Sequence, residues 1–332
     1  MAKYLEKMKV IIPVAGMGTR LKPHTHTTPK VLLHVAGKPI LGHILDELNS
    51  ANLKEIILII GTMGEQIVEY VQKNYSFELN YVKQIEPLGQ AHAIYLAQKF
   101  VLKDEPVLII FGDTIFKTNL KEVVNRKTTA LGVKTVEEAK RFGVVELQGN
   151  QIKNVVEKSP NPPSNLAMVG LYFIRNSMLL FNCLRRLIDS NRKLKGEFWL
   201  TDALQMMIEN GEKMETFFVD GWYDCGKFET LLATNRQLLQ GRATTHCPLG
   251  SIVIPPVYIS DSAKIEGSVI GPYVSIADYS VIKHSIIRDS IINKNSIVET
   301  VVLHNSIVGD NAVVKGSYRK LNVGDSSEVD LI

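Results

Sequence analysis

The sequence is poor in cysteine, in long apolar runs and in net charge, and each shortage excludes a class of protein. Its 332 residues include three cysteines, Cys183, Cys225 and Cys247. An odd number at such wide spacing argues against a disulfide framework or a zinc site, so we expect a reducing, cytoplasmic environment. No apolar run approaches the ~20 residues of a membrane-spanning helix, and we expect no signal peptide. The formal net charge of +4 is too small to indicate binding to nucleic acid or to a membrane.

Up to about Asn235, strand-like segments alternate with helix-like segments. The strand-like segments are short and rich in β-branched residues, at 9–13, 55–61, 78–84 and 106–113. The segments between them carry apolar residues at helical spacing, at 39–52, 64–75 and 89–100. This alternation predicts an α/β fold with a Rossmann-like, mainly parallel sheet covered on both faces. Shorter strand-like segments add to one rim of that sheet, at 129–135, 143–147 and 168–174.

From Ser251 to Val314 the composition changes to Ile, Val, Ser, Asp, Asn and Gly, with a six-residue apolar period. The rows with this step are Ile270, Ile276 and Ile282; Ile286, Ile292 and Val298; Ile291, Ile297 and Leu303; and Val302, Val308 and Val314. Such a period predicts a short left-handed parallel β-helix, in which one aliphatic residue per face points inward. An antiparallel sandwich is the alternative. We therefore expect two domains, residues 1–240 and 241–332.

The segment VAGMGTR, residues 14–20, follows the first expected strand. Its glycines, Gly16 and Gly18, allow a phosphate to approach backbone N–H groups, and we expect a helix to follow. A dinucleotide-binding loop needs a third glycine at the position of Leu21. A Walker motif ends in Gly-Lys-Ser or Gly-Lys-Thr, whereas residues 21–23 are Leu, Lys and Pro. Two cations, Arg20 and Lys30, accompany the loop. They favour a triphosphate that is attacked at its α-phosphate, with pyrophosphate leaving.

Further motifs follow in a fixed order, at residues 84–92, 111–113, 142–146, 156–158, 169–172, 196–197 with 201–202, and 221–226. Together with Gly16-x-Gly18-Thr19-Arg20-Leu21 and Pro29-Lys30, they resemble the sugar-1-phosphate nucleotidylyltransferases over nearly the whole chain. These enzymes join a nucleoside triphosphate to a sugar 1-phosphate and release pyrophosphate, and long members carry a C-terminal left-handed β-helix.

The resemblance implies roles for individual residues. Arg20, Lys30 and Asp113 would be catalytic, and Asp113 and Asp224 would hold Mg²⁺, which prefers carboxylate and phosphate oxygens. The nucleotide would be bound by Ala15, Gly16, Gly18, Thr19, Gln84 and Gly89. The sugar phosphate would be bound by Gly143, Glu157, Lys158, Gly170 and Trp222. A catalytic role for Cys225 is disfavoured by the carboxylate beside it, and His24 and His26 are read as solvated side chains.

The motifs favour glucose 1-phosphate as one substrate and dTTP or UTP as the other. GDP-mannose-type and N-acetylglucosamine-type pyrophosphorylases remain alternatives, as do a non-catalytic regulatory or scaffold homologue and an additional acyltransferase site in the β-helix. A β-helix this short has apolar ends and an apolar face to cover. We therefore expect it to pack against the catalytic domain or another subunit, in a homo-oligomer.

Overall fold

The computed structural model describes residues 8–241 and 250–316, which form two compact units. The first, here called the sheet unit, contains the described residues up to Leu33 and the range Lys38–Thr234. The second, the β-helix unit, contains His34–Gly37 and the described residues from Asn235 onward. Within the described ranges, no helix is both long enough and apolar enough to cross a membrane.

A nine-stranded sheet forms the centre of the sheet unit, with strand order β5-β4-β1-β6-β11-β8-β12-β10-β9. In chain order its strands are β1 (Lys9–Val14), β4 (Glu55–Ile60), β5 (Glu78–Lys83), β6 (Val107–Ile110), β8 (Thr129–Thr135), β9 (Gly143–Gln148), β10 (Gln151–Glu157), β11 (Leu166–Ile174) and β12 (Met214–Phe218). Short strands elsewhere are β2 (His34–Val35), β3 (Lys38–Pro39), β7 (Thr114–Lys117) and β13 (Gly221–Asp224).

The sheet is parallel in its first half and mixed in its second. Strands β5, β4, β1 and β6 pair in parallel, as the strand-helix alternation predicts. Beyond them β11 is antiparallel to β6, β8 and β9, and β10 is antiparallel to β9 and β12. Short connections between successive strands, such as the turn from β9 to β10, permit antiparallel pairing only. The expected Rossmann-like sheet is therefore confirmed, with a large antiparallel extension at the predicted rim.

Helices cover both faces of this sheet, because successive side chains of its strands point to opposite sides. In β1, Val10, Ile12 and Val14 join one apolar cluster with α2, α3 and α5, whereas Ile11 joins the other with α4, α6 and α7. The helices are α2 (Ile40–Ser50), α3 (Gly64–Asn74), α4 (Gln90–Tyr95), α5 (Leu120–Val124), α6 (Ser177–Asp189), α7 (Leu200–Glu209) and α8 (Phe228–Leu239). Short 3₁₀ turns are η1 (Thr19–Leu21), η2 (Lys30–Leu32), η3 (Leu96–Phe100) and η4 (Ala139–Arg141).

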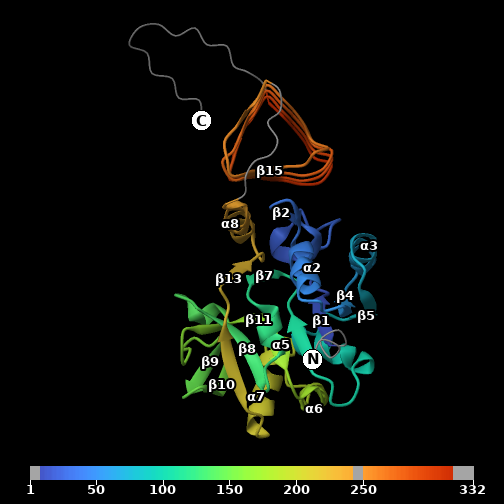
Figure 1. Ribbon diagram of the computed structural model, residues 1–332, viewed down its shortest axis with the longest axis vertical. Helices are drawn as coiled ribbons and strands as arrows, with labels where there is room; N and C mark the ends of the chain where they lie inside the picture. The colour runs from blue at the N-terminus through green and yellow to red at the C-terminus, as the bar shows by residue number, and fades with distance from the viewer. Residues whose placement is uncertain (1–7, 242–249, 317–332) are drawn as a thin grey trace. The chain divides into compact units, whose positions relative to one another are not determined.

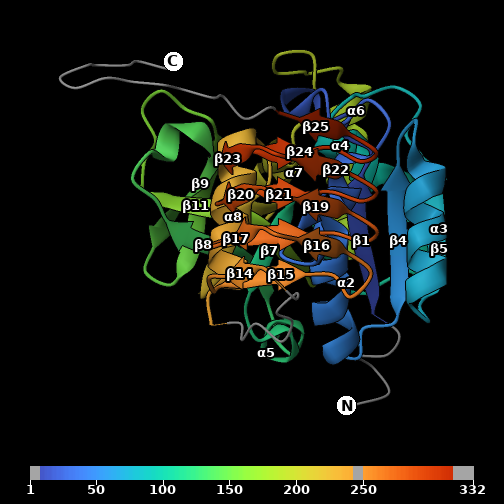
Figure 2. The same cartoon turned by 90° about the horizontal axis from the view of Figure 1, so that it is seen from above.

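The β-helix unit is a stack of triangular coils, as the six-residue period predicts (Figure 1). Three parallel sheets form its sides, and their strands lie above one another along the stack (Figure 2). The first sheet contains β14 (Ile252–Val253), β17 (Val269–Ile270), β20 (Ile286–Arg288) and β23 (Val302–His304). The second contains β15 (Val257–Ile259), β18 (Val274–Ile276), β21 (Ile291–Ile292) and β24 (Ile307–Val308). The third contains β16 (Lys264–Glu266), β19 (Val281–Lys283), β22 (Ile297–Glu299) and β25 (Val313–Lys315).

The residues that point into the β-helix differ in part from the predicted rows. The row Ile270, Ile276 and Ile282 is confirmed, but Ile287 and not Ile286 comes next, since Ile287 is buried and Ile286 is exposed. Ile297 and Val302 also lie outside, and Ile291 is buried without joining the inner cluster. The other members of the predicted rows do join that cluster: Ile292, Val298, Leu303, Val308 and Val314. The reason is the length of the coil: Ile270 pairs with Ile287, 17 residues on, and Ile287 with Leu303, 16 residues on. Some corners therefore take five residues where the strict period assumes six.

Asn235 connects three chain segments of the β-helix unit. Its side chain is fully buried, and Oδ1 accepts hydrogen bonds from the Ala36 backbone N–H (2.9 Å) and the Ser275 hydroxyl (2.6 Å). Its Nδ2 donates to the Tyr273 carbonyl at 3.1 Å. The next residue, Arg236, forms an ion pair with Asp289. The last turns of α8 and the segment His34–Gly37 are thereby fixed to coils that are far away in the sequence.

Candidate functional site

Two adjoining cavities open in the sheet unit at the carboxyl ends of β1 and β6, the edge where open α/β sheets bind ligands. One, the nucleotide cavity, has a volume of about 400 Å³ and contains every residue that the sequence assigns to the nucleotide: Ala15, Gly16, Gly18, Thr19, Gln84 and Gly89. The other, the sugar cavity, has a volume of about 350 Å³ and contains every residue assigned to the sugar phosphate: Gly143, Glu157, Lys158, Gly170 and Trp222. Arg20, Gln90 and Phe111 line both cavities.

The glycine loop leads into a single 3₁₀ turn, Thr19–Leu21, where an α-helix was expected. Pro23, two residues after that turn, lacks the N–H that a continuing helix needs. Gly18 has φ +61°, and a Cβ at this position would lie 2.9 Å from Cβ of Lys30, so the loop packs directly against that lysine. Any anion here is therefore bound by the loop's own N–H groups and nearby cations, since no long helix adds its dipole.

Lys30 and Asp113 form an ion pair in the nucleotide cavity. Lys30 starts η2, and its Nζ lies 2.7 Å from Oδ2 of Asp113, which follows β6. The lysine side chain is 8% exposed and the aspartate side chain is 42% exposed. The enclosed position by itself would raise the pKa of Asp113, but the ammonium of Lys30, with a smaller effect of Arg20, outweighs it and lowers that pKa. The carboxylate is therefore ionised and presents its open side to the cavity.

Asp224 is brought to Asp113 by a small two-stranded sheet. Strand β13 pairs with β7, so that Asp224 lies opposite Thr114, and the Cys225 N–H donates to the Asp113 carbonyl at 3.2 Å. Oδ1 of Asp224 accepts from the Gly226 N–H at 2.8 Å. Two carboxylates, each with lone pairs beyond these contacts, fit Mg²⁺, which takes one or two protein carboxylates and completes its shell with phosphate oxygens and water. The described residues contain no group of three or more His, Cys, Asp or Glu side chains that could hold a metal by themselves.

The loop from Gln84 to Gly89 is here called the base loop. Contacts within the protein fix the side-chain amide of Gln84. Nε2 of Gln84 contacts the Gly89 carbonyl at 3.1 Å and Nδ1 of His92 at 3.0 Å. Burial is the largest cause that lowers the pKa of His92, so its ring is neutral and Nδ1 can accept. Both amide hydrogens are used in this way. The carbonyl oxygen Oε1 is the atom of Gln84 that remains for a base.

The sugar cavity has a wall of side chains in close contact. The Thr201 hydroxyl donates to Oε2 of Glu157 at 2.6 Å, which fixes the carboxylate. A Cβ at Gly143 would lie 2.7 Å from that same Oε2, so the glycine allows the strands to approach. Tyr172 lies beside them, and burial and then the charge of Glu157 raise the pKa of its hydroxyl, which stays protonated.

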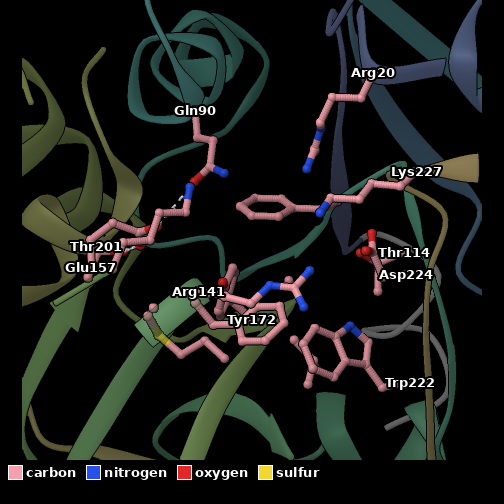
Figure 3. Close-up of a pocket in the computed structure, with 17 residues that line it drawn as sticks. Arg20, Gln90, Thr114, Arg141, Glu157, Tyr172, Thr201, Trp222, Asp224 and Lys227 are labelled. Carbon is pink, nitrogen blue, oxygen red and sulfur yellow. Dashed lines mark hydrogen bonds and ion pairs between the residues drawn. The ribbon is translucent and has the colours of Figure 1, made fainter. Parts of the chain in front are cut away.

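Cations point into the sugar cavity from several elements. Arg20, Arg141 and Lys227 extend toward its centre, with Asp224 and Trp222 along one side (Figure 3). The sequence analysis did not select Arg141 or Lys227. Each stands directly beside a motif, Arg141 before Phe142 and Lys227 after Gly226, and this adjacency was the available signal. Their positive charge suits a site for phosphorylated substrates.

The cysteines and the loop histidines are not assigned a role from the sequence. Cys225 is fully buried, and burial raises the pKa of its thiol to about 12, so it forms no thiolate near neutral pH. Cys183 is also buried, and Cys247 lies outside the described residues. His26 is exposed, and neither His24 nor His26 belongs to a metal-binding group in the described residues.

Comparisons with known proteins agree with this geometry. The family model described as nucleotidyl transferase matches residues 9–241. The low-salt glycan biosynthesis nucleotidyltransferase Agl11 of Haloferax volcanii is 31% identical, over 98% of this chain and 100% of its own length. A glucose-1-phosphate thymidylyltransferase of Streptomyces antibioticus is 29% identical, over 98% of this chain and 99% of its own. The bifunctional protein GlmU of Methanococcus maripaludis is 37% identical, but over 70% of this chain and only 54% of its own length.

Solved structures show the same fold. A Bacillus anthracis structure described as a glucose-1-phosphate thymidylyltransferase has 26% sequence identity and a TM-score of 0.62, covering 72% of this chain and 98% of that one. A UDP-glucose pyrophosphorylase complexed with UDP-glucose has a TM-score of 0.63 over 71% of this chain and 99% of that one, and its 24% identity supports the fold alone. From the family model and the full-length relative, the chain belongs to the nucleotidyl transferase family.

Proposed function

We propose that this protein transfers a nucleotidyl group from a nucleoside triphosphate to a sugar 1-phosphate, giving a nucleoside diphosphate sugar and pyrophosphate. Glucose 1-phosphate and either dTTP or UTP are the favoured substrates. The names of two relatives are in line with this, the glucose-1-phosphate thymidylyltransferase of Streptomyces antibioticus and the UTP–glucose-1-phosphate uridylyltransferase AglF of Haloferax volcanii. N-acetylglucosamine-type and GDP-mannose-type pyrophosphorylase activities are the alternatives that the sequence motifs leave open. The proposal concerns the sheet unit. We also propose that the catalytic domain ends, and the β-helix domain begins, near residue 240.

One observation carries this proposal. The residues assigned to the nucleotide line one cavity, the residues assigned to the sugar phosphate line the next, and Arg20 lines both. A phosphate oxygen of the sugar 1-phosphate can then approach the α-phosphorus of the triphosphate across the shared wall. No protein nucleophile is needed, because phosphoryl and nucleotidyl transfer depend mainly on positioning and on charge stabilisation.

The proposed roles follow from charge and position. Arg20 and Lys30 stabilise the negative charge that develops on the triphosphate, and Gly16, Gly18 and Thr19 donate backbone N–H groups to it. Asp113 and Asp224 would hold Mg²⁺, which would supply further stabilisation of phosphate charge. Because Lys30 contacts Asp113 directly, the same carboxylate also fixes the direction of the lysine.

Base preference is proposed to depend on Gln84. Its free Oε1 can accept the imide N–H of thymine or uracil, which adenine lacks. In the sugar cavity, Glu157 accepts hydrogen bonds from sugar hydroxyls, while Lys158 and Arg141 bind the phosphate. Gly143, Gly170 and Trp222 shape the wall.

The test is pyrophosphate release by the purified full-length chain over a panel of nucleoside triphosphates and sugar 1-phosphates. We expect release with glucose 1-phosphate and dTTP or UTP, dependent on Mg²⁺. Release with another pair would correct the substrates only. No release from a folded protein with any pair would contradict the proposal and favour the non-catalytic scaffold.

The β-helix is proposed to serve self-association. Ile252, Ile286 and Val302 lie in register on the outer side of one of its sheets and are 61%, 39% and 74% exposed. Exposed aliphatic rows of this kind are typical of interaction surfaces. Light scattering should show a homo-oligomer, and Val302→Asp should reduce its mass; a monomeric full-length chain would contradict this.

The free thiols Cys183 and Cys225 support a cytoplasmic location as part of the same proposal.

A further inference from the structure

Lys158 of the sugar cavity lies over the face of an aromatic side chain. Its Nζ is 3.8 Å from the centroid of the Trp199 ring. The tryptophan is 9% exposed, whereas the Lys158 side chain is 42% exposed. A cation over an indole ring is attracted by the negative face of the π-system, so the buried ring holds an ammonium that an anion can still reach. Trp199 does not line either cavity and was not selected from the sequence.

The position of the Trp199 ring is fixed by its neighbours. Its Nε1 donates to the Leu194 carbonyl at 3.0 Å. The adjacent Phe198 is bonded to the chain around the base loop: its N–H donates to the Leu88 carbonyl at 2.8 Å, and its carbonyl accepts from the Ala91 N–H at 3.0 Å. The ring therefore offers a fixed surface to the Lys158 side chain.

The backbone of Lys158 has an uncommon conformation. Lys158 has φ +43°, in the left-handed region that non-glycine residues rarely adopt, and its N–H donates to the Phe142 carbonyl at 3.0 Å. Such a conformation persists where the surroundings impose it, and it often marks a functional position. Lys158 follows the last residue of strand β10, Glu157, and its conformation turns the chain at this point.

We propose that Trp199 is a positioning residue that holds the ammonium of Lys158 ready for the phosphate of the sugar 1-phosphate. This inference rests on the proposed function. An aromatic face attracts the ammonium without accepting its N–H groups in ordinary hydrogen bonds and without neutralising its charge, so both remain available for an anion. The nearby carboxylate of Glu157 makes only a 3.5 Å contact with Nζ, and its other oxygen is bonded to Thr201.

Kinetics of three variants test the role in the full-length protein. Trp199→Leu should raise KM for the sugar 1-phosphate by roughly 3- to 30-fold, the range that one cation–π contact supports. KM for the nucleotide should not change. Trp199→Phe keeps an aromatic face and should restore most of the affinity. Lys193→Met is the matched control, because Lys193 lies 5.1 Å from the neighbouring Phe198 ring and outside both cavities; it should leave both KM values unchanged.

A spectroscopic measurement tests the contact without turnover. The sequence has two tryptophans, so Trp222→Phe leaves Trp199 as the sole one. In this background Lys158→Met should change the emission of the unliganded protein. Glucose 1-phosphate and inorganic phosphate should each change the emission when Lys158 is present, and should have no effect when it is replaced.

The outcomes separate the two proposals. A folded Trp199→Leu protein with unchanged KM for the sugar 1-phosphate, or with both KM values raised equally, would overturn the positioning role while the enzyme assignment stands. If the wild type releases no pyrophosphate with any pair, the proposed function fails. The emission then decides about Trp199: a phosphate response that requires Lys158 supports the positioning of an anion-binding ammonium, and its absence overturns it.

Discussion

The two cavities are built from different parts of the chain. The nucleotide cavity is lined by the glycine loop and Gly89, and it contains one ion pair, Lys30–Asp113. The sugar cavity is lined mostly by residues of the antiparallel half of the sheet unit and by polar residues that contact one another, such as Glu157 and Thr201. Backbone N–H groups recognise phosphates whatever the neighbouring side chains are, whereas sugar hydroxyls require specific polar groups. On the proposed function, we expect variants in the first cavity to affect mainly the chemistry and variants in the second to affect mainly sugar selection.

The largest effect is expected for Asp113→Asn. It removes a proposed metal ligand and the partner of Lys30, so activity at ordinary Mg²⁺ should be abolished. Excess Mg²⁺ should restore part of the rate. Steady-state pyrophosphate release as a function of Mg²⁺ is the measurement. A variant that kept both the rate and the Mg²⁺ dependence of the wild type would remove Asp113 from the metal site.

Lys30→Ala should lower kcat by roughly 10²- to 10³-fold, the scale for one preorganised group that stabilises a transition state. The KM for the sugar 1-phosphate should change little, since Lys30 lines the nucleotide cavity alone. Lys22→Ala, an exposed lysine of the same loop, is the control. Wild-type turnover by a folded Lys30→Ala protein would mean that the ion pair is structural.

Gly143→Ala should act on the second cavity only. The added methyl would lie 2.7 Å from Oε2 of Glu157 and from Cε of Met168, so the Glu157 carboxylate must shift. A displaced hydrogen-bonding group costs about 1–3 kcal/mol, which corresponds to a KM for the sugar 1-phosphate raised by roughly 5- to 150-fold. The KM for the nucleotide should stay the same. Equal effects on both substrates would contradict the separation of the two cavities.

Gln84→Ala should weaken the preference among bases more than it weakens triphosphate binding. In the proposed function the preference depends on one acceptor atom, Oε1, and loss of one such hydrogen bond reduces discrimination by about 10-fold. The ratio of kcat/KM for dTTP or UTP to that for ATP, whose base lacks the imide N–H, measures it. A constant ratio would show that the base is read elsewhere.

The smallest effect is a dependence of base preference on pH. Because burial lowers the pKa of His92, its ring stays neutral at pH 6.5 and gains a proton only at a lower pH. Protonation turns Nδ1 from an acceptor into a donor, which breaks its contact with Gln84. Base preference should therefore be constant above pH 6.5 and decline below it. In a His92→Ala protein the ratio should no longer depend on pH; if it still does, another group is responsible.

Local pattern predicted the architecture well and the fine geometry less well. Strands such as Glu55–Ile60 are fully buried runs of β-branched residues, so their type follows from composition. The phase of the β-helix did not follow: Ile286 and Ile287 are chemically identical, and only the five-residue corner before them determines which one points inward. Corner length depends on contacts between coils, which a period in the sequence does not contain.

The candidate site divides in the same way. Lys30, Asp113 and Asp224 stand within recognisable motifs, and the structure places them at the cavities as expected. Arg141 and Lys227 lie one residue outside a motif, and basic residues at such positions are common on protein surfaces. Trp199 reads as an ordinary buried aromatic, because its contact with Lys158 joins residues 41 positions apart through the fold (199 and 158).

The hydrogen bonds of Phe198 also limit which substitutions the base loop can accept. A Cβ at Gly89 would lie 2.6 Å from the Phe198 carbonyl, so no other residue fits there unless the segment around Phe198 moves. Such a movement would carry Trp199 with it and displace Lys158 from its ring. A new base preference selected through the base loop should therefore arrive with a changed sugar affinity. In this protein the two specificities are expected to evolve together, and libraries that vary only one cavity should yield fewer active variants than libraries that vary both.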